Sequence, residues 1–149
     1  MTRLFAYGSN MASAEIGAWC PEARFAGVAR LRDRRLELRR RSLRWGGGAA
    51  DIVPAPGDEV WGALYELPAG ALDRLDAKEG EGFAYRRVAV EVEAGGRRLA
   101  AEAYEVAVRE PNEVPPTPEY AALVVRAARE RGLPEGWVAR LAALLVGDA

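Results

Sequence analysis

One short segment of the chain carries the residue types that can hold a ligand through the backbone. At residues 5–11 the apolar run Phe-Ala-Tyr stops at Gly8, Ser9 and Asn10, and a helix is expected from residue 12 onward. Glycine adopts positive φ without steric cost, and Ser9 or Asn10 can cap that helix. Such a strand–turn–helix junction turns several N–H groups toward one spot, where the helix dipole adds partial positive charge. The segment therefore suits a carboxylate or a developing oxyanion, although a plain helix start would have the same sequence.

A second candidate is an acidic residue on an apolar helix face. In a helix over residues 69–80, projected at about 100° per residue, Leu72 and Leu75 define the buried stripe. Glu79 falls between them, whereas Lys78 projects to the opposite side. Burial and the C-terminal end of the helix dipole both raise the pKa of Glu79, toward the range of a general base that returns its proton. The alternative is that the helix ends by Lys78 and Glu79 projects into water.

Missing residue types exclude several kinds of site. The chain has no histidine, and Cys20 is its only cysteine. Ser-His and Cys-His catalysis, most transition-metal sites, intrachain disulfides and thiolate zinc clusters are therefore excluded. A Schiff base would depend on Lys78, the only lysine. We expect Cys20 to be a packing residue at a helix end, and any catalysis to need no cofactor or metal.

The composition is that of a globular protein with little net charge. Of 149 residues, 50% are hydrophobic and 29% are charged, and the formal net charge is −1. This size suits one domain with a real core, which we expect over residues 1–149. No global field attracts nucleic acid, and the apolar runs fall short of the ~18 residues that span a bilayer. With no secretory pattern at the N-terminus, we expect a cytoplasmic location.

Strand-like segments come before the long helices, which predicts an α+β fold. In residues 97–108, apolar residues stand at both odd and even positions, which indicates a strand buried on both faces, as in a curved sheet or barrel. Gly95-Gly96 joins this strand to residues 85–93 as a hairpin. Residues 41–50 are expected to form a loop, and the prolines and Gly57 at 54–58 a turn. The other expected strands are the opening apolar run and residues 25–31, 35–38, those near Ile52, and 59–66.

Proline and glycine also mark the expected helices. Pro68 suits the first turn of the helix that carries Glu79, and Gly80 suits its C′ position. Thr117 and Pro118 open a helix with an apolar stripe at i, i+3, i+4 and i+7, which Gly132 ends. Pro134 opens a last helix of the same pattern. These helices must cover the outside of the sheet.

Taken together, six segments resemble the gamma-glutamylcyclotransferase family over nearly the whole chain. Each segment is weak alone, but their order and spacing are specific. The resemblance implies a small mixed β-barrel flanked by helices, the gamma-glutamylcyclotransferase-like or AIG2-like fold. The segments are FAYGSN at 5–10, VARL at 28–31, GGGA at 46–49, PGDEVWG at 56–62, LDAKEG at 75–80 and PPTPEY at 115–120.

The resemblance also implies roles for individual residues. The family's acid–base glutamate falls on Glu79, and tyrosines near its pocket correspond to Tyr85 and Tyr120, the former across a loop of variable length. The loop at residues 7–11 would hold the glutamyl group through its backbone. The substrate-binding residues implied there are Tyr7, Gly8, Ser9, Asn10 and Met11.

The implied reaction is an intramolecular acyl transfer on a small γ-glutamyl substrate. The α-amine of the substrate attacks its own γ-carbonyl, so the substrate itself provides proximity. Glu79 takes a proton from the α-ammonium and delivers it to the departing amine. Backbone N–H groups near Ser9 stabilise the oxyanion, and the products are 5-oxoproline and a free amine or amino acid. No cofactor is required.

Other functions remain open from the sequence. The substrate can be a γ-glutamyl dipeptide, a γ-glutamyl amine or a larger metabolite such as glutathione, and rim loops at residues 41–50 and 109–116 would decide this. A non-catalytic small-molecule-binding or regulatory module with the same fold is the alternative to an enzyme, although it would keep a costly buried acid. A homodimer is possible, and we expect no membrane partner.

Nucleic-acid binding is a further alternative, because one stretch is dense in arginine. However, Leu36 and Leu38 alternate with charged residues there, as on a strand with one solvated face. We therefore expect no nucleic-acid partner. The arginines concerned are Arg30, Arg32, Arg34, Arg35, Arg39, Arg40, Arg41 and Arg44.

Overall fold

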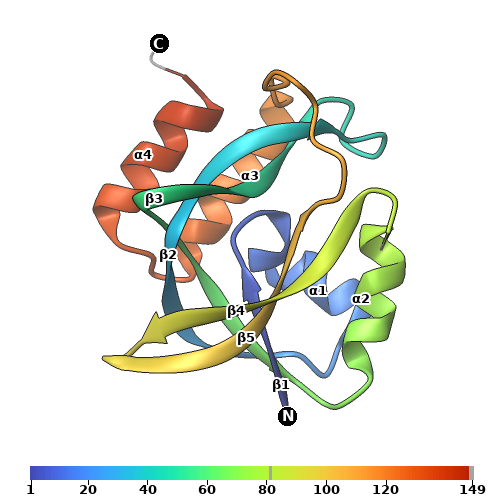
Figure 1. The fold of residues 1–149 in the computed structure, drawn as a ribbon, viewed down its shortest axis with the longest axis vertical. Coiled ribbons are helices and arrows are strands. Elements are labelled where there is room, and N and C mark those ends of the chain that lie inside the picture. The colour runs from blue at the N-terminus through green and yellow to red at the C-terminus, as the bar shows by residue number, and fades with distance from the viewer. Residues whose placement is uncertain (81, 148–149) are drawn as a thin grey trace.

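Five strands close into a barrel in the computed structural model, which describes residues 1–80 and 82–147. The strand order around the barrel is β1-β3-β2-β4-β5, and β1 closes it by a parallel contact with β5. All the other strand pairs are antiparallel (Figure 1). The strands are β1 (Thr2–Ala6), β2 (Arg24–Arg41), β3 (Gly48–Leu67), β4 (Tyr85–Ala94) and β5 (Arg97–Val106).

Two of these strands are much longer than the sequence predicts. The expected strands at 25–31 and 35–38 are both parts of β2. Strand β3 runs without a break through the end of the expected loop at 41–50, the expected turn at 54–58 and the expected strands near Ile52 and at 59–66. The predicted turn at residues 54–58 is wrong. The ladder shifts register there, and Asp33 adopts φ 63° and accepts a hydrogen bond from the N–H of Gly57 (2.9 Å). A bulge tolerates prolines, because its residues need no ladder hydrogen bonds.

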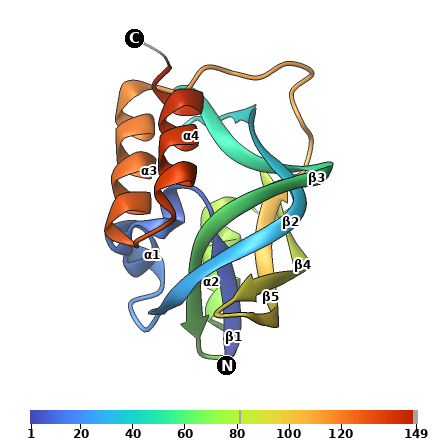
Figure 2. The ribbon, with the colours of Figure 1, turned by 90° about the vertical axis from the view of Figure 1, so that its left-hand side faces the viewer.

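Four α-helices flank the barrel, so the predicted mixed barrel with helices is confirmed. Figure 1 shows α1 and α2 on one flank and α3 and α4 on the other, and Figure 2 shows α3 and α4 packed side by side. Gly80 ends α2 in the left-handed conformation, and the Thr117 hydroxyl caps α3, both as predicted. The helices are α1 (Ser13–Trp19), α2 (Ala71–Glu79), α3 (Pro118–Glu130) and α4 (Glu135–Leu145).

The start of α1 differs from the prediction. Residues Ser9–Met11 form a short 3₁₀-helix, η1, and Ala12 is the N-cap of α1 without any side-chain capping bond. The predicted cap by Ser9 or Asn10 is therefore wrong. The Asn10 amide turns instead toward the end of α2. Cys20 follows α1 and is fully buried, as expected of a packing residue.

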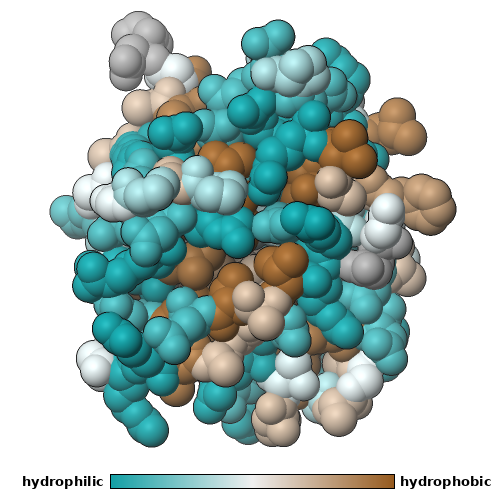
Figure 3. Space-filling model, in the orientation of Figure 1, coloured by the Kyte–Doolittle hydropathy of each residue, from teal (hydrophilic) through white to brown (hydrophobic). Residues whose placement is uncertain are grey.

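The hydropathy of the surface and the lengths of the helices are relevant to whether the chain contacts a membrane or another partner. Figure 3 shows hydrophilic residues over most of one face of the barrel, with smaller hydrophobic groups between them. Among the residues that the structure describes, no helix is long and apolar enough to cross a membrane.

Candidate active site

Two adjoining cavities meet at the end of α2. The smaller one, which we call the inner cavity, has a volume of about 40 Å³, and the larger one, which we call the outer cavity, has a volume of about 360 Å³. A volume near 40 Å³ holds little more than one water-sized group, whereas a few hundred Å³ is typical of small-molecule sites. A ligand would therefore place one polar group inside and the rest of its atoms outside. Four residues line both cavities: Ser9, Glu79, Tyr85 and Tyr120.

Glu79 lies at the junction of the two cavities and is the last residue of α2. Its side chain is partly buried, and its Oε1 accepts a hydrogen bond from Nδ2 of Asn10 (2.9 Å). Burial raises the pKa of Glu79 above its ordinary value, while Lys78, the Asn10 amide and Arg44 act in the opposite direction. The alternative that Glu79 projects freely into water is wrong. A carboxylate with a raised pKa inside a cavity can both take up and return a proton.

Lys78 does not point away from Glu79 as the helix projection predicts. Its side chain is only 8% exposed, and its Nζ donates to Oδ1 of Asn10 and lies 3.9 Å from Oε1 of Glu15. Burial lowers the pKa of Lys78. The projection fails because α1 packs against α2 and Asn10 of η1 bonds to the side chains at its end, so the side of α2 that carries Lys78 is covered as well. Asn10 therefore bridges a lysine and Glu79, with its donor turned to the carboxylate.

Part of the loop predicted at residues 7–11 lines the inner cavity. Gly8, Ser9 and Asn10 line it, and among the described residues the N–H groups of Ser9 and Asn10 have no acceptor. The contribution predicted from a helix dipole is weak, because η1 is a single 3₁₀ turn. Two free donors at the wall of a small cavity still suit an anionic oxygen.

The other two residues of this loop have mainly structural contacts. Tyr7 lines the inner cavity but is buried, and its hydroxyl donates to the carbonyl of Tyr104. Met11 lines neither cavity and is fully buried, so the structure does not bring its side chain to the site. The sequence motif groups Met11 with the loop only because they are adjacent in the chain.

Tyr85 and Tyr120 both hold the backbone of Ala50. The Tyr85 hydroxyl donates to the Ala50 carbonyl (3.0 Å), and the Ala50 N–H donates to the Tyr120 hydroxyl oxygen (2.9 Å). Strand β1 pairs only with residues 63–67 of β3, so these hydroxyls bond a part of β3 that β1 does not reach. Burial raises the pKa of both phenols, that of Tyr120 to about 12, so both are neutral hydroxyls near pH 7.

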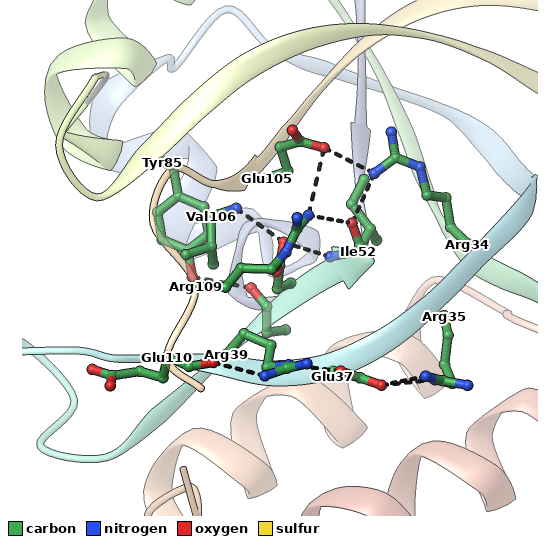
Figure 4. A network of polar contacts seen from close by, with 12 residues as sticks. Arg34, Arg35, Glu37, Arg39, Ile52, Tyr85, Glu105, Val106, Arg109 and Glu110 are labelled. Carbon is green, nitrogen blue, oxygen red and sulfur yellow. Dashed lines mark hydrogen bonds and ion pairs between the residues drawn. The ribbon is translucent and has the colours of Figure 1, made fainter. Parts of the chain in front are cut away.

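A buried polar network anchors the strand next to Ala50. Asp51 is fully buried, and its carboxylate accepts from the N–H groups of Ile52 and Val106 and from Nε of Arg109 (2.6 Å). Arg34 joins the network through the Ile52 carbonyl (2.8 Å), as Figure 4 shows. Sequence reasoning missed this anchor. Its one visible signal is a carboxylate inside an otherwise apolar segment of β3.

Sequence reasoning anticipated only part of the wall of the outer cavity. The expected rim loop at residues 41–50 does line it, whereas the other expected rim loop, at residues 109–116, lines neither cavity. The rest of the wall includes residues of α1 and the end of β2, which no single motif connects. In the described part of the chain, no group of three potential ligands is placed to hold a metal ion. The outer-wall residues that sequence reasoning did not place at the site include Glu15, Ala18, Trp19 and Arg40.

Known proteins resemble this chain in sequence and in structure. A model of the AIG2-like family matches residues 59–141. A gamma-glutamylcyclotransferase of Mus musculus is 34% identical over 146 residues, which is 94% of this chain and 77% of the relative. One of Homo sapiens is 35% identical over 150 residues, 97% of this chain and 79% of the relative.

A solved structure agrees with this assignment. It is named gamma-glutamyl cyclotransferase, is 33% identical and superposes with a TM-score of 0.90, over 95% of this chain and 86% of its own. The predicted resemblance is confirmed. The chain belongs to the AIG2-like family and, by its similarity to these relatives, to the gamma-glutamylcyclotransferases.

Proposed function

We propose that the chain cyclises the γ-glutamyl group of a γ-glutamyl amino acid or amine to 5-oxoproline and releases the amine. The similarity to gamma-glutamylcyclotransferases supports this class of reaction. The observation that carries the proposal is Glu79. This carboxylate lies where the outer cavity meets the inner cavity, and burial raises its pKa.

The proton transfers follow from the position of Glu79. In the first step Glu79 removes a proton from the substrate's α-ammonium, and the amine nitrogen attacks the γ-carbonyl carbon. In the second step the protonated Glu79 gives its proton to the leaving nitrogen as the original C–N bond breaks, and the extra proton on the new ring nitrogen also passes to the released amine, which leaves as an ammonium group. Because nucleophile and electrophile belong to one molecule, the protein has only to fold the substrate into a reactive conformation.

The inner cavity suits the oxyanion of the tetrahedral intermediate. Ser9 and Asn10 line it, and their N–H groups have no acceptor among the described residues, so they are available as donors. The Tyr120 hydroxyl accepts from Ala50 N–H, and its own proton has no acceptor among the described residues, so it can donate to the substrate. The Tyr85 hydroxyl already donates to the Ala50 carbonyl, so Tyr85 would contribute only to the shape of the cavity. Donors fixed before the reaction stabilise developing charge without reorganisation.

The alternatives have less support. Glu79 forms no ion pair with any described residue, and a partly buried, unpaired acid is a cost that a purely structural or regulatory module would not need. For nucleic-acid binding, six of the eight arginines are ion-paired with acids, which leaves little uncompensated basic surface. The paired ones are Arg30, Arg32, Arg34, Arg35, Arg39 and Arg44.

One experiment tests the proposed reaction. The purified chain is incubated with γ-glutamyl dipeptides, γ-glutamyl amines and glutathione, and 5-oxoproline is measured by mass spectrometry. We expect release of 5-oxoproline from at least one compound at a rate proportional to the protein concentration. Binding of these compounds without any 5-oxoproline would instead favour the non-catalytic module.

A further inference from the structure

The outer cavity has three cationic side chains, and two of them are occupied. Arg44 pairs with Glu15 (2.7 Å), and its guanidinium lies 4.6 Å from the ring centre of Trp45. Lys78 donates to the Asn10 amide. Arg40 is different, because it forms no hydrogen bond or ion pair within residues 1–80 and 82–147 although it is partly buried.

Arg40 faces the cavity by its position in the sheet. It pairs with Ala49 across β2 and β3, and both residues line the outer cavity. Burial raises the pKa of Tyr85, and the charge of Arg40 acts against that rise from within the same cavity. The neighbouring Arg39 does not line the cavity and bonds to Glu37 and to the carbonyl of Glu110, as Figure 4 shows, and also to the carbonyl of Pro111. The unused guanidinium therefore belongs to the cavity.

We propose that Arg40 is a specificity-determining residue that binds the carboxylate of the leaving amino acid. This inference rests on the proposed function. At about 40 Å³ the inner cavity is too small for a leaving amino acid, whereas the outer cavity, at about 360 Å³, has room for it, so we place the leaving group in the outer cavity. Its nitrogen must reach Glu79 to receive the proton, and an α-carboxylate lies only two bonds from that nitrogen.

Charge in the cavity makes a free cation necessary for such a substrate. A leaving-group carboxylate near Glu79 would meet like charge from Glu79, and the Arg44 guanidinium on the same wall is already paired with Glu15. An arginine offers a planar pair of donors that matches a carboxylate, and Arg40 has its donors unoccupied. A γ-glutamyl amine without a carboxylate would leave this guanidinium unsatisfied.

A matched pair of substrates tests the inference. γ-Glutamyl-L-alanine and γ-glutamylethylamide differ only in the carboxylate. We expect the wild-type chain to prefer the dipeptide by about 10- to 100-fold in kcat/KM for 5-oxoproline release, the range for a charged hydrogen-bond pair in a cavity. Arg40→Gln should bring the ratio close to one through loss on the dipeptide. Arg41→Gln removes the same charge from an exposed neighbour outside the cavity and should keep the wild-type ratio.

Two results would overturn the assignment of Arg40. One is a wild-type chain with no preference for the dipeptide. The other is an equal loss on both substrates in Arg40→Gln, which would mean that Arg40 holds the glutamyl part. If neither compound is turned over, the proposed function fails but the assignment of Arg40 is still open to test. Calorimetry with the same two compounds then measures whether Arg40 binds the carboxylate. Tighter binding of the dipeptide that Arg40→Gln abolishes supports the inference, and equal binding contradicts it.

Discussion

Replacing Tyr120 by Phe should destabilise the chain by removing the hydrogen-bond acceptor of a buried backbone group. The Ala50 N–H donates to the Tyr120 hydroxyl, and both residues are only 3% exposed. In the variant this N–H has no replacement acceptor among the residues that the structure describes. The change removes a single oxygen atom, so it isolates the polar contact from the packing of the ring.

The expected loss follows from the cost of an unsatisfied buried donor. Such a donor costs about 1–3 kcal/mol. For a chain of this size, each kcal/mol lowers Tm by about 2–4 °C, so a loss near 2 kcal/mol corresponds to about 4–8 °C. Urea unfolding followed by tryptophan fluorescence gives the free energy of unfolding directly.

Tyr65→Phe is the matched control. Tyr65 is 2% exposed, and its hydroxyl donates to the Met11 carbonyl (2.6 Å). That carbonyl also accepts from Nε of Arg131 (3.2 Å), so it stays satisfied when the hydroxyl is removed. We expect the control to lose about 1 kcal/mol or less. Equal losses in the two variants, or a Tyr120→Phe chain as stable as the wild type, would refute the reasoning.

Three further predictions concern the site and the sheet beneath it. Asn10→Ala removes a donor that lowers the pKa of Glu79, so the acid limb of kcat/KM against pH should move to higher pH, and an unmoved limb would count against this role. Because burial raises the pKa of Glu79 above its ordinary 4.5, the unfolded chain binds fewer protons above that pH. Wild-type stability should therefore fall relative to Glu79→Gln as pH rises from about 4 through the folded pKa; a Tm difference that does not vary with pH would contradict this. In Gly48→Ala the new Cβ would lie 1.8 Å from the Val114 carbonyl oxygen, so urea unfolding should show a loss of about 3 kcal/mol or more, and a loss below about 1 kcal/mol would show that the segment yields easily.

Features with local signals could be predicted from the sequence. The hairpin at Gly95-Gly96, the Thr117 cap and the Gly80 helix end depend on a few adjacent residues, and the structure has all three. The prediction at residues 54–58 failed because prolines in a strand are tolerated only when a distant partner bulges with them. That partner is Asp33 on β2, and no local pattern marks it.

The same distinction applies to the candidate site. Glu79 stood out because an acid on an apolar helix face is visible in the periodicity. Lys78 was misplaced because the projection cannot show that α1 packs against α2 and that Asn10 of η1 bonds to the side chains at its end. Arg40 is one of several neighbouring arginines in the sequence. The ion pairs of Arg39 and Arg44 distinguish it from those two, and its place in the wall of the outer cavity distinguishes it from the exposed Arg41.

The central claim is that Glu79 transfers the proton while the Gly8–Asn10 backbone binds the substrate. The most direct test is kcat/KM for 5-oxoproline release by Glu79→Gln, with Ser9→Ala as control and circular dichroism to check the fold of both variants. The account predicts a loss of about 10²- to 10⁴-fold for Glu79→Gln, because a general acid–base residue contributes about that much, and near wild-type activity for Ser9→Ala. A folded Glu79→Gln chain that keeps its activity while Ser9→Ala loses it would contradict the account.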